Sequence, residues 1–122
     1  MRAKSKPSTA KHPFIPAYSA RDVEAALFAA ELGSAPEIDL HGQSTNIALS
    51  EMETFLHQEM MYGSDVVRII HGRGGQILRQ AIMKRLEQMK KQQLVAGYRD
   101  TTNPMQAGAV TLVALYRIPR QR

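Results

Sequence analysis

The chain contains no cysteine and no tryptophan, and only 6% of its 122 residues are aromatic. Without cysteine it can form neither a disulfide nor a thiolate metal site. No apolar run approaches the ~20 residues that cross a bilayer. The N-terminus, MRAKSKPSTAKHPF, is basic but has no apolar core, unlike a secretory signal. We therefore expect a cytoplasmic protein without a membrane partner.

Positive charge is concentrated in particular segments, although the net charge is only +5. Residues 1–21 and 117–122 are basic, whereas residues 37–70 are rich in acids. Residues 71–99 contain one acid, Glu87, and seven basic residues, namely Arg73, Arg79, Lys84, Arg85, Lys90, Lys91 and Arg99. Clustering of one sign indicates an anionic partner, and nucleic acid is the first candidate. Solubility alone is the alternative explanation.

Hydrophobic periodicity predicts alternating strands and helices. Met52, Leu56 and Met60 recur every four residues, as on one face of a helix, whereas VVRII reads as a buried strand. The expected elements are helices over 20–32, 45–62 and 77–92 and strands over 37–41, 66–70, 94–98 and 110–117. This βαβαββ order predicts an α/β fold: a two-layer sandwich of two main helices on a four-stranded mixed sheet, plus the N-terminal helix.

Composition divides the chain into three segments. Residues 1–18 form a basic, proline-rich tail that we expect to be disordered on its own. Residues 19–36 hold the N-terminal helix and a linker, and residues 37–122 form the core domain. One compact domain with a tail is the organisation expected for this length.

Two of the predicted strands end in His-Gly, at His41-Gly42 and at His71-Gly72. If these strands pair in parallel, their carboxyl ends lie at the same edge of the sheet. Open α/β sheets bind ligands at that edge. The two His-Gly pairs are therefore expected to converge on one site although they are thirty residues apart.

The segment after the second strand, HGRGG, favours phosphate binding. The N-terminus of the helix that follows offers free backbone N–H groups, and Arg73 offers a planar guanidinium. The expected phosphate-binding residues are Gly42, Gly72, Gly74, Gly75, Arg79, Lys84, Lys90 and Lys91.

Each of these features has another interpretation. A histidine at a strand end can be purely structural, and HGRGG matches neither the dinucleotide-binding pattern nor the Walker loop. The two histidines and Asp39 can also be read as a zinc or manganese site. The cationic Arg73 beside them argues against a metal, and we expect neither a metal nor another cofactor.

The succession IDLHGQ, a helix, VVRIIHGRG-xx-LR and a final VTLV strand resembles the small MutS-related (Smr) domain over about residues 37–117. The resemblance implies a two-layer α/β sandwich. It also implies nicking of DNA or, in the family's ribosome-rescue members, cleavage of mRNA on stalled ribosomes. No ATPase motif accompanies the pattern, so the stand-alone form of the domain is expected.

The family motifs correspond to particular residues of this chain. The family's D-x-H corresponds to Asp39 and His41, its H-G-[KR]-G to residues 71–74, and its L-R to residues 78–79. Gly75-Gln76 replaces the usual Thr-Gly, and residues 106–109 replace a late glycine run. We expect these departures to change the loops that hold the substrate rather than the fold.

These residues predict an endonuclease, with RNA favoured over DNA as substrate. His41 would act as general base or acid, oriented by Asp39. Arg73 and the backbone N–H groups of the 72–76 turn would stabilise charge on the phosphate. His71 would act as a partner acid or a substrate ligand. The strand ends carry no cluster of carboxylates, so a two-metal centre is not expected.

Two other functions stay open at this level. One is a DNA-nicking endonuclease of the repair or recombination type. The other is a non-catalytic adaptor that binds nucleic acid or the ribosome through the same basic surface.

Overall fold

The computed structural model describes residues 20–74 and 76–116. The predicted tail, Gly75 and the C-terminal arginines lie outside the described residues. The elements are α1 (Ala20–Leu32), β1 (Glu37–Asp39), α2 (Thr45–Tyr62), β2 (Val66–Ile70), α3 (Gln76–Lys91), β3 (Val95–Asp100), η3 (Pro104–Gln106) and β4 (Val110–Leu115). The predicted order of helices and strands is confirmed, and the short η3 lies in a segment predicted as loop.

The four strands form one mixed sheet in the order β1-β2-β4-β3. β1 and β2 run parallel, with Asp39 opposite Ile70. β4 pairs antiparallel with both β2 and β3. The parallel pair at one edge is the arrangement that brings two strand ends together, and it requires the crossover through α2.

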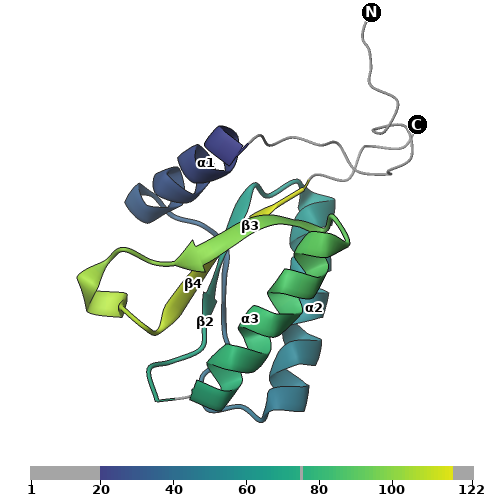
Figure 1. Cartoon of the computed structure of the whole chain (residues 1–122), viewed down its shortest axis with the longest axis vertical. Helices are drawn as coiled ribbons and strands as arrows, with labels where there is room; N and C mark the ends of the chain where they lie inside the picture. Colours follow the sequence, from purple (N-terminus) through teal and green to yellow (C-terminus); the bar gives the residue numbers. More distant parts are fainter. Residues whose placement is uncertain (1–19, 75, 117–122) are drawn as a thin grey trace, which may run out of the picture.

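α2 and α3 cover one face of the sheet side by side (Figure 1). Met52, Leu56 and Met60 of α2 are buried, as are Ile82 and Leu86 of α3. The four-residue spacing of these side chains places them on one stripe of each helix, facing the sheet. This packing confirms the α/β fold predicted from the sequence.

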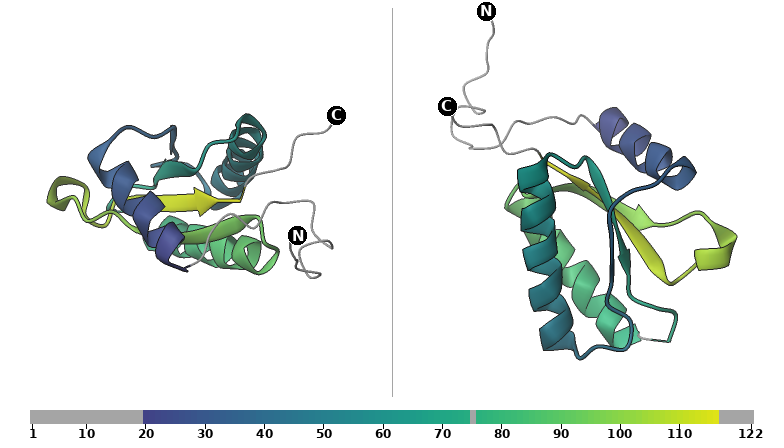
Figure 2. Two further views of the ribbon diagram at one scale, coloured as in Figure 1. Left: turned by 90° about the horizontal axis from the view of Figure 1, so that it is seen from above. Right: turned by 180° about the vertical axis from the view of Figure 1, so that it is seen from behind.

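α1 covers the opposite face of the sheet (Figure 2). Its Leu27 and Ala30 pack in a second apolar cluster with Leu112 and Ala114 of β4. β4 is thereby buried on both faces, and all six of its residues are buried. A strand covered on both sides has no face toward solvent, which explains why VTLVAL is apolar apart from Thr111. The N-terminal helix is thus a third, partial layer packed on the two-layer core.

No helix within residues 20–74 and 76–116 has the length and apolar character needed to cross a membrane.

α1 packs tightly against Gly97 of β3. A Cβ atom at this position would lie 2.7 Å from Cγ1 of Val23 in α1. Because a β-branched valine has little freedom at χ1, it cannot swing aside cheaply. We predict that Gly97→Ala lowers the free energy of unfolding by about 1–3 kcal/mol, the usual cost of overpacking.

Chemical denaturation of the single and double variants tests this contact. Val23→Ala in the Gly97→Ala background should restore part of the lost stability, because it removes the atom that clashes. An equal loss of stability in the single and double variants would show that Gly97 is needed for another reason.

Candidate active site

The parallel pairing of β1 and β2 brings the two His-Gly segments together. The backbone N–H of Leu40 donates to the carbonyl of Ile70 at 2.7 Å, so pairing continues to the end of both strands. Gly72 has φ +85°, and a Cβ there would lie 3.0 Å from the Cβ of His41. Position 72 therefore requires glycine both for its left-handed backbone and for its contact with His41. The predicted convergence of the two strand ends is present in the structure.

Asp39 and His41 form a hydrogen-bonded pair at this edge. Asp39 Oδ1 lies 2.6 Å from His41 Nδ1 and also accepts from the His41 backbone N–H at 3.1 Å. The hydrogen bonds from the His41 side chain and amide lower the pKa of Asp39, so its carboxylate is ionised at neutral pH. The two side chains remain 53% and 68% exposed, respectively. With Nδ1–H donating to Asp39, Nε2 of a neutral His41 is left as a proton acceptor open to solvent.

His71 lies at the neighbouring strand end but is only 1% exposed. Its Nε2 lies 2.9 Å from Oγ1 of Thr111. The Thr111 hydroxyl also lies 3.2 Å from Asp100 Oδ1, and His71 Nδ1 lies 3.3 Å from the carbonyl of Gly72, so the ring has a polar neighbour at each nitrogen. Burial lowers the pKa of His71, which keeps the ring neutral at neutral pH. The ring joins β2 to β4 from inside the protein and does not face solvent.

Arg73 reaches across to the loop between β3 and β4. Its Nε donates to the carbonyl of Ala107 at 3.1 Å, and its Nη2 donates to the carbonyl of Met105. The carbonyl of Ala109 accepts from the backbone N–H groups of His71 and Gly72 at 2.9 and 3.1 Å. The loop that departs from the family's glycine run therefore holds the HGRG turn through its backbone carbonyls.

The other predicted phosphate-binding residues are dispersed. Gly42 and Gly74 lie in the turns at the strand-end edge, whereas Gly75 is outside the described residues. Arg79 forms an ion pair with Asp100 at 2.5 Å, which neutralises much of its charge. Exposed lysines continue along α3, and the last two lie in its final turn, about 20 Å from its N-terminus at 1.5 Å per residue. These lysines are Lys84, Lys90 and Lys91.

Sequence reasoning missed three residues that support the site. Thr111 and Asp100 complete the hydrogen-bond network behind His71. Glu31 of α1 binds the start of the β3–β4 loop. Their partners are between 11 and 71 residues away along the chain, so no local spacing signals them.

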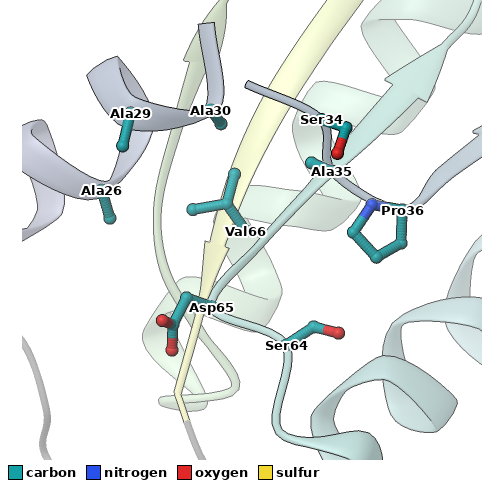
Figure 3. A pocket seen from close by; sticks show the side chains of 9 residues that line it. All are labelled: Ala26, Ala29, Ala30, Ser34, Ala35, Pro36, Ser64, Asp65 and Val66. Carbon is teal, nitrogen blue, oxygen red and sulfur yellow. The ribbon is translucent and has the colours of Figure 1, made fainter. Parts of the chain in front are cut away.

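A pocket of about 300 Å³ lies elsewhere, between α1 and the start of β2 (Figure 3). Ala26, Ala30, Pro36, Asp65 and Val66 are among the residues that line it. The Asp39–His41 pair is not part of its wall. Over the described ranges, no group of three or more imidazole and carboxylate side chains is placed to hold a metal ion.

Comparisons with family models, with solved structures and with other protein sequences all match the same domain. The model of the Smr domain family matches residues 38–116. The solved structure of the Smr domain of Thermus thermophilus MutS2 matches with a TM-score of 0.61 and 33% identity, over 66% of this chain and 98% of that one. Endonuclease MutS2 of Caldicellulosiruptor saccharolyticus is 36% identical over 78 residues, and that of Fusobacterium nucleatum is 41% identical over 54 residues.

The matched segments cover 64% and 44% of this chain but only 10% and 7% of these two MutS2 proteins. The likeness is thus to one domain of a much longer protein. That domain is matched almost completely by the Thermus structure, and the family model covers well over half of the chain. The chain belongs to the Smr domain family.

Proposed function

We propose that this chain is an endonuclease that cleaves RNA with His41 as the general base. The observation that carries the proposal is the Asp39–His41 contact of 2.6 Å on an exposed strand end, with the backbone of Gly72 against the histidine. An imidazole oriented by a carboxylate, with its second nitrogen open to solvent, is suited to accept a proton from a substrate.

The proposed reaction uses the ribose 2′-OH as nucleophile. His41 Nε2 takes the 2′-OH proton while the 2′-oxygen attacks phosphorus and the bond to the 5′-oxygen breaks. Water protonates the departing 5′-oxygen, because the His71 ring is buried. His71 then serves to hold the turn rather than as the partner acid.

Charge on the phosphate is stabilised by the HGRG turn. Gly72 lies against His41, and the next residue, Arg73, supplies a guanidinium. Groups that are already oriented before the reaction are the most effective stabilisers of developing charge. The hydrogen bonds of Arg73 to the β3–β4 loop supply that orientation.

The family and its relatives support the nuclease class. The Smr domain match and the MutS2 relatives, which are named endonucleases, point to a nuclease-type or nucleic-acid-binding role. We propose RNA as the substrate because its ribose 2′-OH can act as the nucleophile once His41 has removed the proton. DNA lacks this hydroxyl. The exposed lysines of α3 would contact the phosphates of a bound strand.

The test compares single-stranded RNA with DNA of the same sequence, each incubated with the purified chain in EDTA. We expect cleavage of the RNA and none of the DNA, because the route needs a 2′-OH and no metal. Metal-dependent nicking of the DNA would contradict the choice of RNA. Tight binding of both strands without cleavage of either, with or without added divalent metal, would identify a non-catalytic adaptor instead.

A further inference from the structure

Glu31 connects α1 to the start of the β3–β4 loop. Its Oε1 accepts from the Thr101 hydroxyl at 2.6 Å, and its Oε2 accepts from the Thr102 backbone N–H at 2.7 Å and the Thr102 hydroxyl at 2.9 Å. Arg99 Nη1 also donates to Oε2, at 2.8 Å. The Glu31 side chain is only 6% exposed. One carboxylate thus satisfies four donors from β3 and the loop that follows it.

These hydrogen bonds make the carboxylate a strong anchor. Burial alone raises the pKa of Glu31, but the bonds from Thr101, Thr102 and Arg99 outweigh it and lower the pKa to about 2. Glu31 is therefore ionised at neutral pH, and hydrogen bonds to an ionised acceptor are about twice as strong as neutral ones.

Hydrogen bonds connect the anchored loop to Arg73. The N–H of Asn103 donates to Oγ1 of Thr101 at 3.2 Å, and Oδ1 of Asn103 accepts from the N–H of Met105 at 2.9 Å. The carbonyls of Met105 and Ala107 then accept from the Arg73 guanidinium. A continuous series of hydrogen bonds therefore runs from α1 to Arg73, the residue that follows Gly72.

We propose that Glu31 is a positioning residue for Arg73, acting through residues 101–109 of the β3–β4 loop. The proposal rests on the function proposed above. α1 lies outside residues 38–116, which match the family model, so this anchor comes from a helix outside the matched region. A carbonyl can orient the guanidinium only if the loop that carries it is held, and Glu31 holds that loop.

The first test is the rate of RNA cleavage by Glu31→Gln. The amide removes the charge and one acceptor oxygen, so we expect kcat to fall about tenfold with little change in KM, as for a small misplacement of a charge-stabilising group. In an Arg73→Ala background the same change should have no further effect. Glu24→Gln is the matched control, because Glu24 lies on the same helix and 3.7 Å from Arg99 but is 71% exposed.

The second test does not depend on activity. The backbone N–H groups of His71 and Gly72 donate to Ala109 of the same loop, so their hydrogen exchange reports on its attachment. Exchange should be faster in Glu31→Gln and in Thr102→Val, which removes one donor from an exposed position, but not in Glu24→Gln. Unchanged exchange overturns the positioning role even if the wild type cleaves RNA. Faster exchange in a chain that cleaves nothing supports the attachment and overturns only the proposed function.

An additive effect of Glu31→Gln and Arg73→Ala on kcat would also overturn the proposal, since it would mean that the glutamate acts on stability or on another group.

Discussion

Replacement of His41 by alanine is expected to lower the rate of RNA cleavage by about 10²–10⁴-fold, the usual contribution of a general base. Affinity for the same RNA should change little. The imidazole is 68% exposed and hydrogen-bonds to Asp39, which is itself 53% exposed, so its removal leaves no buried group unsatisfied. Loss of cleavage with retained binding separates a catalytic histidine from one that only binds.

His57 provides the matched control. It is an exposed histidine within α2, where its Nδ1 lies 2.8 Å from the carbonyl of Glu53, one turn earlier on the same helix. His57→Ala should cleave RNA at the wild-type rate. Equal residual cleavage in His41→Ala and the wild type would remove His41 from the mechanism, whatever the strength of binding.

The fold could be predicted from the sequence because its main signals are local. The four-residue spacing of Met52, Leu56 and Met60 specifies the buried stripe of α2, and the β-branched run VVRII specifies β2. The convergence of His41 and Gly72 follows from parallel pairing of the strands that precede them. A rule of sheet geometry was enough to place those two segments together.

The direction of individual side chains could not be predicted in the same way. His71 follows its strand as His41 follows β1, yet its ring is buried against Thr111, forty residues later. Arg73 is held by backbone carbonyls, and any residue can supply a carbonyl, so no sequence pattern indicates this contact. Arg79, which we predict to contact phosphate, also pairs with Asp100 of β3, and no local pattern indicates that ion pair.

The position of α1 on the sheet could not be predicted from the sequence either. Its sequence predicts a helix but not the face of the sheet on which it packs. That position depends on the small side chains of Gly97 and Ala114, which leave room for a helix on the second face. The role of Glu31 follows from this packing, because only a docked α1 brings its carboxylate to Thr101 and Thr102.

A single 2′-deoxy substitution at the scissile nucleotide should abolish cleavage at that position. The proposed nucleophile is then missing, while every phosphate contact is retained. Cleavage at neighbouring ribonucleotides in the same strand is the internal control for binding and enzyme activity. Continued cleavage at the deoxy position at the original rate would show that water, not the ribose hydroxyl, attacks the phosphorus.

The chemical ends of the cleaved RNA test the central claim most directly. Mass spectrometry of fragments formed in EDTA should find a 2′,3′-cyclic phosphate on one fragment and a 5′-OH on the other, because the 2′-oxygen forms the new bond and the 5′-oxygen leaves. Fragments that carry a 5′-phosphate and a 3′-OH would contradict the account of His41 as the base that activates the 2′-OH.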